Sequence, residues 1–313
     1  MASVEKSPSA DGVVVDSHAH LKPQKGGLPL QFWMMLPAIA LLAGLTLYPF
    51  FYMIYMSLNK VSLIGGVSFD WVGLRNWQSM FTDSGIKAGW WITIVYFVST
   101  VGLELVLGVT IALLIYEQVW ARNIILSLLL MPMFIAPVVV GLLGEFLCDP
   151  VHGLYAWGLR GLKLFTGNIL GNADSALVAV ILMDVWEWTP LVALITLAGL
   201  TALPKDLLEA ASIDGATYWQ KLWHIMAPLS TGVVTVALLI RSMDAIRDFA
   251  IILITTNGGP ADATKTIPIR LYETAFRFFN LGYAAAIGLS MVVVTILLAT
   301  AFLETLRKRN LIQ

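Results

Sequence analysis

Four charged side chains lie inside one long apolar segment: Arg241, Asp244, Arg247 and Asp248. Asp244 and Arg247 follow at three-residue spacing and Asp248 lies four residues after Asp244, which places them near one face of a helix. Charges at membrane depth are costly and normally face a bundle interior or a wet cavity. The cluster has two interpretations: an internal Arg–Asp ladder that holds helices together, or the wall of a path for a polar substrate.

A second apolar segment carries a comparable group just before Pro190: Asp184, Trp186, Glu187 and Trp188. An indole face packs on sugar C–H groups, while carboxylates and arginines hydrogen-bond hydroxyls, so this chemistry suits carbohydrate. Tryptophans near the ends of membrane spans are otherwise commonly interface anchors. We expect the anchor role for Trp90 and Trp91, and for Trp188 both interpretations stay open.

A connection between two apolar segments has a distinctive pattern. It reads Glu209-Ala-Ala-Ser-Ile-Asp214-Gly215, then nine residues, then Ile225-Met-Ala-Pro228. The sequence predicts a short amphipathic helix over Leu203–Ile213, with Gly215 able to serve as its C-cap. A second short helix is expected over Ala216–Ile225, ending before Pro228 opens the next segment. Small Ala210 and Ala211 make the elbow a compact knob, although a plain amphipathic loop on the headgroups is the alternative.

The elements that position these residues are membrane spans. Hydrophobic residues make up 58% of the 313 positions and charged residues only 12%, with a mean hydropathy of +0.81, which is typical of membrane proteins. A span needs about 20 mostly apolar residues. Six segments qualify, approximately Phe32–Met56, Trp90–Tyr116, Ile124–Leu147, Ala176–Leu200, Leu229–Thr255 and Tyr283–Leu303. The predicted fold is all-α, a polytopic bundle of six transmembrane helices.

The remaining composition excludes several classes of function. A net charge of −1 without a dense basic stripe argues against nucleic acid. The single cysteine, Cys148, rules out an intrachain disulfide and a cysteine metal cluster. His18 and His20 lie in a polar N-terminal tail over residues 1–30, and we expect no metal site there and a loosely ordered cytoplasmic extension.

The orientation is only weakly indicated by charge. An even number of spans puts both termini on one side of the membrane. Lys and Arg residues are divided almost equally between the two sets of loops, so the positive-inside rule is not decisive. The Arg307-Lys308-Arg309 cluster directly after the last segment favours cytoplasmic termini.

The pattern around Glu209 resembles the EAA loop of binding-protein-dependent ABC permeases: Glu-Ala-Ala, three residues, Gly, nine residues, Ile-x-Leu-Pro. Only the Leu differs, and Ala227 stands there. Further stretches resemble the sugar branch of maltose-type and glycerol-3-phosphate-type permeases: Tyr48-Pro-Phe50, Val72-Gly-Leu-Arg-Asn-Trp77, Asn257-Gly-Gly-Pro260 and Leu281-Gly-Tyr-Ala-Ala-Ala286. The likeness covers roughly residues 30 to 305.

The resemblance implies the domain organisation and the partners. It implies a transmembrane permease domain over residues 31–306, with the coupling loop 201–228 and the tail 307–313 in the cytoplasm of a bacterial cell. The elbow would dock on an ATPase subunit, with contacts from Glu209, Ala210, Ala211, Asp214, Gly215 and Pro228. No Gly-x-x-x-x-Gly-Lys-Ser/Thr loop is present, so we expect no cofactor here, with ATP and Mg²⁺ on the partner ATPase. The expected assembly adds a second permease, two ATPase subunits and a periplasmic sugar-binding protein in the inner membrane.

The resemblance also implies which side chains line a sugar path. Positions counted from the shared motifs are Glu187, Trp188, Leu191, Arg241, Asp244, Ala245 and Asp248. Acids and an arginine at these positions make maltose itself an unexpected cargo. Arg241 either favours a sugar with an anionic group or neutralises Asp244 or Asp248, and the sequence leaves both open.

Two other classes of protein are weighed against this one. A membrane-embedded transferase would use Asp184, Glu187 and Asp248, but such enzymes usually carry an acidic metal motif on a surface loop, and these acids lie inside spans. An ion-driven carrier is the other rival, and it would need no ATPase. Co-purification with an ATPase discriminates between these classes.

Overall fold

The computed structural model describes residues 30–117 and 120–308, and these are mostly helical. The expected cytoplasmic tail, with His18 and His20, lies outside the described residues, as does the chain after Lys308. The chain divides into two units, residues 1–50 and 51–313. The described part of the first unit is one helix, α1 (Leu30–Ser57), whose last residues belong to the second unit.

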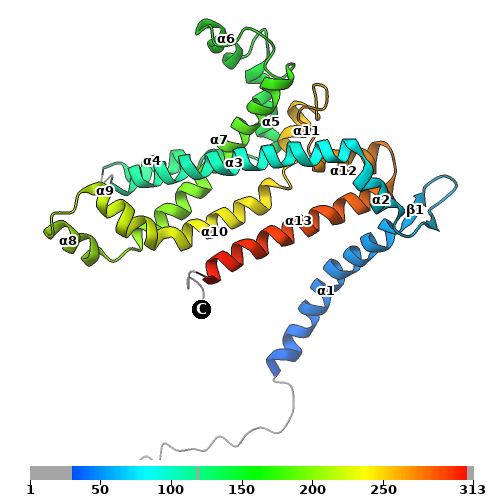
Figure 1. The fold of residues 1–313 in the computed structure, drawn as a ribbon, viewed down its shortest axis with the longest axis horizontal. Helices are drawn as coiled ribbons and strands as arrows, with labels where there is room; N and C mark the ends of the chain where they lie inside the picture. Colours follow the sequence, from blue (N-terminus) through cyan, green and yellow to red (C-terminus); the bar gives the residue numbers. More distant parts are fainter. Residues whose placement is uncertain (1–29, 118–119, 309–313) are drawn as a thin grey trace, which may run out of the picture. The chain divides into compact units, whose positions relative to one another are not determined.

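Four long helices lie alongside one another and form the body of this unit (Figure 1). They are α3 (Ser84–Glu117), α7 (Ala173–Thr201), α10 (Ala227–Ala245) and α13 (Leu281–Lys308). Within the described chain, five helices are long and apolar enough to cross a membrane, and a bent pair gives a sixth crossing if it counts as one span. The predicted all-α fold is confirmed.

The third predicted span is broken, and the expectation of one helix over Ile124–Leu147 is wrong. The chain forms α4 (Arg122–Leu130), a 3₁₀ turn (Pro132–Phe134) and α5 (Pro137–Cys148), and the two arms meet at a bend of 93°. Pro132 and Pro137 lack the N–H that would continue the helical ladder, and their rings crowd the preceding turn. Pro190, by contrast, lies within the continuous helix α7.

The two ends of the body carry different connections (Figure 1). At one end lie α8 (Lys205–Ile213) and α9 (Tyr218–Lys221). At the other end lie the hairpin β1–β2 (Asn59–Ser62 and Ser68–Trp71), α2 (Arg75–Thr82) and α12 (Ile267–Tyr272). The antiparallel hairpin pairs Lys60 with Asp70. The short helices α6 (Leu154–Gly161) and α11 (Ala250–Thr255) lie beside the α5 arm.

Helices α3 and α7 approach closely because small residues lie between them. A Cβ atom at Gly108 would lie 2.8 Å from the Val192 side chain and 3.0 Å from the Ala193 backbone nitrogen. Small residues at such positions let membrane helices pack backbone to backbone. This contact holds the two helices that carry Glu104 and Asp184 together.

Asp83 fixes where α3 begins. One of its oxygens accepts hydrogen bonds from the backbone N–H groups of Gly85 (2.7 Å) and Ile86 (3.3 Å), and the other accepts one from the Tyr283 hydroxyl at 2.9 Å. Partial burial alone would raise the pKa of Asp83, but these bonds and the nearby Arg270 outweigh it and lower that pKa. The cap therefore ties α3 to the first turn of α13.

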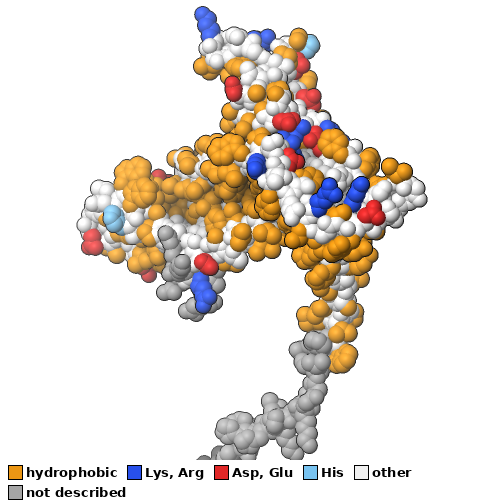
Figure 2. Space-filling view, turned by 45° about the vertical axis from the view of Figure 1, so that its right-hand side comes forward, with side chains coloured by type: hydrophobic (Ala, Val, Ile, Leu, Met, Phe, Trp, Pro, Cys, Tyr) orange, Lys and Arg blue, Asp and Glu red, His pale blue; other side chains and the backbone are white. Residues whose placement is uncertain are grey.

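The outer surface of the body is apolar. Figure 2 shows hydrophobic side chains over much of the visible surface between the two ends of the long helices. Val106 on α3 is 63% exposed and Leu297 on α13 is 62% exposed. Helices with internally satisfied backbones and apolar outer faces suit a bilayer. Trp91 lies on this surface, whereas Trp90, for which an anchor role was also expected, packs against buried Met80, Ile86, Ile267 and Ile287.

Candidate transport path and coupling surface

A buried ionic triad joins three helices at the centre of the body. Arg241 on α10 donates from Nε to Glu104 on α3 at 2.7 Å, and from Nη2 to Asp184 on α7. The arginine side chain is 1% exposed and both carboxylates are fully buried. Charges taken out of water need such complementary partners, so the triad holds α3, α7 and α10 in register.

The sequence left open whether Arg241 neutralises Asp244 or Asp248, and in the structure its partners are Glu104 and Asp184 instead. Helix α10 ends at Ala245, so Arg247 and Asp248 do not continue its face. Asp244 instead pairs with Arg247 at 2.9 Å, and both side chains are about half exposed. Asp248 accepts a hydrogen bond from the Tyr96 hydroxyl on α3. The four charges belong to three separate groups of contacts rather than one ladder.

Glu187 is the least satisfied acid in this region. It lies on α7, fully buried, and neither carboxylate oxygen has a hydrogen-bond partner among the described residues. Arg241 and Asp248 are near enough to interact with it electrostatically. A buried acceptor pair without a partner is a place where a ligand's hydroxyls gain most from binding.

The other expected path residues lie around this group. The half-buried Trp188 ring has the Arg241 guanidinium carbon 5.5 Å from its centroid, which is cation–π distance. Leu191 is half-buried and Ala245 is buried. The structure thus brings Glu187, Trp188 and Asp248 close to Arg241, and places Asp244 at the exposed edge.

Glu104 is the residue that the sequence reasoning missed. It is the only charged residue between Trp90 and Tyr116, in the middle of α3. An isolated acid in an apolar span was itself a signal of an internal partner. The second carboxylate oxygen of Glu104 and that of Asp184 are also buried without hydrogen-bond partners in the described chain, and so are the hydroxyls of Thr189 and Ser242.

The predicted elbow is confirmed in its first half. Helix α8 ends at Ile213, and Gly215 follows with φ +77°. The Gly215 N–H donates to Ser212 O at 3.1 Å and the Ala216 N–H donates to Ala211 O at 2.9 Å. This bonding satisfies the last carbonyls of α8 and is the Schellman arrangement, which favours glycine.

The second half of the elbow differs from the prediction. Helix α9 starts at Tyr218, after a capping box between Thr217 and Gln220, and not at Ala216. It does not end before Pro228, because a π-helical turn (Leu222–Met226) carries it directly into α10. Pro228 is the second residue of α10 and directly follows the π turn.

The knob at this end presents both charge and apolar surface. Glu209, Ala210 and Asp214 are exposed, and Ala211 is half-buried. The same elbow also exposes large apolar side chains: Leu207, Ile213, Trp219 and Trp223. Exposed apolar side chains together with small and acidic ones make a surface suited to a protein partner.

Residues 104–310 match the family described as binding-protein-dependent transport system inner membrane component. The chain belongs to this family. It is 33% identical to the trehalose/maltose transport system permease protein MalF of Thermococcus litoralis, over 87% of this chain and 90% of the relative. It is 31% identical to the sn-glycerol-3-phosphate transport system permease protein UgpA of Agrobacterium fabrum, over 87% of this chain and 92% of the relative.

The permease also shares its fold with a solved structure. A chain of a bacterial ABC transporter involved in the import of the acidic polysaccharide alginate superposes with a TM-score of 0.79 at 20% identity. The superposition covers 89% of the permease and 95% of that chain. This likeness establishes the ABC importer type of membrane fold for the described helices.

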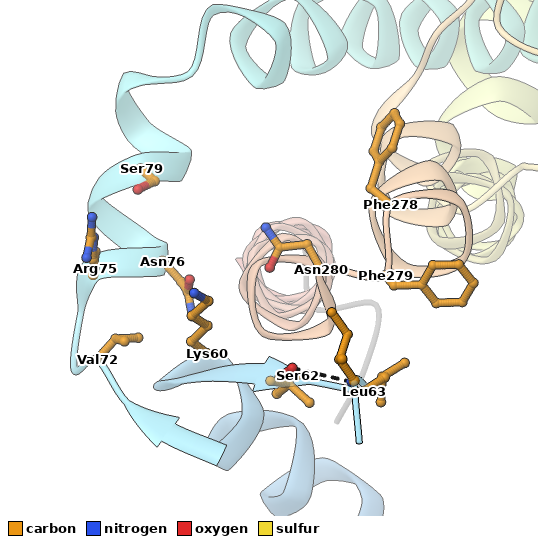
Figure 3. A pocket seen from close by; sticks show the side chains of 12 residues that line it. Lys60, Ser62, Leu63, Val72, Arg75, Asn76, Ser79, Phe278, Phe279 and Asn280 are labelled. Atoms are coloured by element: carbon orange, nitrogen blue, oxygen red, sulfur yellow. Dashed lines mark hydrogen bonds between the residues drawn. The ribbon is translucent and has the colours of Figure 1, made fainter. Parts of the chain in front are cut away.

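A cavity of about 810 Å³ opens at the end of the permease opposite the knob (Figure 3). The hairpin contributes Lys60 and Ser62, α2 contributes Arg75, and the segment before α13 contributes Phe278 and Asn280. Its lining contains two basic side chains and no acidic one. This end therefore offers positive charge beside exposed aromatic surface.

Proposed function

We propose that this chain is the transmembrane permease subunit of an ATP-driven importer that carries a sugar or sugar derivative across the bacterial inner membrane. The observation that carries the proposal is the buried polar group on α7, in which Trp188 lies beside Glu187 and above Arg241. An aromatic face with unpartnered carboxylate oxygens is the chemistry that a polyhydroxy ligand needs. Relatives named for trehalose, maltose and glycerol-3-phosphate transport support it.

The knob would couple the permease to a separate ATPase. Its small residues Ala210 and Ala211 allow close approach, and exposed Glu209 offers a charged contact. Two ATPase subunits would bind ATP and Mg²⁺, and this chain would bind neither. The knob and both termini would then lie in the cytoplasm, with the permease domain of residues 31–306 between them.

The opposite end would receive the sugar from a periplasmic binding protein. The basic cavity around Lys60 and Arg75 suits acidic side chains on such a partner. A second permease of similar fold would complete the path, as in importers of this kind. An alginate transporter has been solved with an alginate pentasaccharide-bound periplasmic protein, which supports this arrangement.

Uptake driven by ATP tests the proposal. The complex would be purified through this chain and reconstituted in liposomes with its binding protein. We expect ATPase subunits to co-purify, and labelled sugar to enter only when ATP is supplied on the knob side. Uptake driven by an ion gradient without ATP would contradict the proposal and favour a carrier. A matched control is the Glu209→Lys variant, which should insert normally but lose sugar-stimulated ATP hydrolysis.

A further inference from the structure

The charge of the cargo can be inferred from the partners of the two arginines at the path, Arg241 and Arg247. This inference rests on the proposed function, because it concerns the sugar that the permease would carry. The relatives do not decide the question, since their names include both trehalose/maltose and sn-glycerol-3-phosphate transport.

Arg241 is already paired with two acids in this structure. Its Nε and Nη2 donate to Glu104 and Asp184. The Trp188 ring lies 5.5 Å from its guanidinium carbon. Two carboxylates already surround this one cation, so the triad carries a net negative charge when both acids are ionised and would repel a phosphate or sulfonate.

Arg247 is the other arginine nearby, and it is also engaged. Its Nε donates to the Met243 carbonyl oxygen at 2.9 Å and its Nη2 donates to Asp244 at 2.9 Å. The Arg247–Asp244 pair therefore has no net charge. An anionic ligand at this edge would meet Asp244 as closely as Arg247.

The groups left for a ligand are acceptors. Both oxygens of buried Glu187 lack partners within the described chain, whereas Glu104 and Asp184 each have one oxygen bonded to Arg241. Carboxylates accept hydrogen bonds from hydroxyls and repel anions. Trp188 supplies the apolar face for sugar C–H groups.

We propose that the cargo is an uncharged polyhydroxy sugar whose hydroxyls donate to Glu187, and that Arg241 is a positioning residue. Arg241 sets the register of α3, α7 and α10 and contacts the Trp188 ring through a cation–π interaction. It does not bind an anionic group of the cargo. The acidic path discriminates against phosphorylated, sulfonated and carboxylated sugars.

The first experiment compares matched neutral and anionic sugars. The complete complex with its binding protein is reconstituted in liposomes, and uptake of labelled trehalose, maltose, trehalose 6-phosphate and sn-glycerol 3-phosphate is measured, with sugar affinity of the binding protein determined in parallel. Uptake confined to uncharged sugars supports the proposal. Transport of a phosphorylated sugar as fast as a neutral one overturns it. If no sugar of either class enters although the complex hydrolyses ATP, the proposed sugar function itself fails, and this inference fails with it.

The second experiment separates positioning from binding. Arg241→Gln should reduce the amount of assembled complex, because two buried acids lose their cation, and adding Asp184→Asn and Glu104→Gln should restore assembly. In the restored complex the KM for the transported sugar should stay near that of the wild type. Glu187→Gln should assemble normally and raise KM by about tenfold, the factor expected for one weakened charge-assisted hydrogen bond. A restored complex whose KM rises as much as that of Glu187→Gln would overturn the positioning role.

Discussion

The Tyr96 hydroxyl on α3 donates a hydrogen bond to the carboxylate of Asp248, which lies in the break between α10 and α11. Two helical turns further along α3, Glu104 accepts from Arg241 on α10. One face of α3 therefore contacts both the C-terminal part of α10 and the segment that follows α10. This pair of contacts fixes where α10 stops.

Replacing Tyr96 with Phe tests the first of these contacts. The variant keeps the ring and removes the hydroxyl that donates to Asp248. Hydrogen bonds between membrane helices contribute about 0.6 kcal/mol on average and up to about 1.7 kcal/mol. We expect a loss of stability in this range, measured by thermal unfolding of the detergent-solubilised complex. Tyr155→Phe, at an exposed position on α6, is the matched control. No difference between the two variants would contradict the bracing role.

Arg241 and Arg247 should differ sharply when each is changed to Met. Arg241→Met leaves Glu104 and Asp184 buried without a cation, and breaking a buried pair typically costs about 3–5 kcal/mol. Arg247→Met removes an exposed pair, which is worth at most about 1 kcal/mol. Size-exclusion chromatography of the assembled complex measures both. Equal recovery of the two variants would show that the triad does not hold the bundle together.

Gly215 should be sensitive to backbone conformation and insensitive to size. Its φ is +77°, and a Cβ added there meets no atom within 4 Å. A left-handed conformation costs an ordinary residue about 1–2 kcal/mol, and Asn tolerates it better. We expect Gly215→Val to lose sugar-stimulated ATP hydrolysis while Gly215→Asn keeps most of it. Equal activity of the Val and Asn variants would remove the turn from the coupling mechanism.

Cysteine labelling tests which end of the permease faces outward. Ile64 in the hairpin connection is 94% exposed and Ile213 at the knob is 86% exposed. Cys148 is 3% exposed, so labelling of the wild-type protein should be slow. In spheroplasts, an impermeant maleimide should label Ile64→Cys and not Ile213→Cys, and after lysis it should label both. Labelling of Ile213→Cys before lysis would invert the proposed orientation.

The loop around Asp262 should lose stability in acid. The hydrogen bond from Lys265 lowers the pKa of Asp262, partial burial opposes this, and Arg270 adds to the lowering. A lowered folded-state pKa means that the stabilisation is complete above the unfolded pKa of about 4 and is lost as the pH falls below it. Hydrogen exchange over residues 256–267, measured relative to the rate of an unfolded chain at the same pH, should therefore accelerate below about pH 4. Asp262→Asn should abolish this dependence, whereas Asp70→Asn should leave it unchanged.

The helices could be predicted from the sequence because each apolar run is long enough to span a bilayer. The break in the third run could not, because Pro132 and Pro137 interrupt it while Pro190 does not interrupt α7. A proline bends a helix when no neighbour compensates for the lost hydrogen bond, and that depends on packing. The turn at Gly215 was predictable because its chemistry is local.

The partners of Arg241 were beyond sequence reasoning for a different reason. Spacing along α10 identifies its own neighbours, Asp244 and Asp248, but the side chain turns toward α3 and α7. Which face of a helix meets which neighbour is set by the close approach at Gly108 and similar positions. A residue in a polar connection need not be exposed: Thr264 lies in such a connection and is fully buried.

The π turn at Leu222–Met226 makes one rod of α9 and α10, from Tyr218 to Ala245. Arg241 lies 23 residues beyond Tyr218, about 35 Å away at the helical rise of about 1.5 Å per residue. A pivot of roughly 5° at the knob would displace Arg241 by about 3 Å over such an arm. That displacement exceeds what the 2.7 Å contact with Glu104 tolerates. A rotation of α9 and α10 at the knob would therefore break the triad at the other end of the rod.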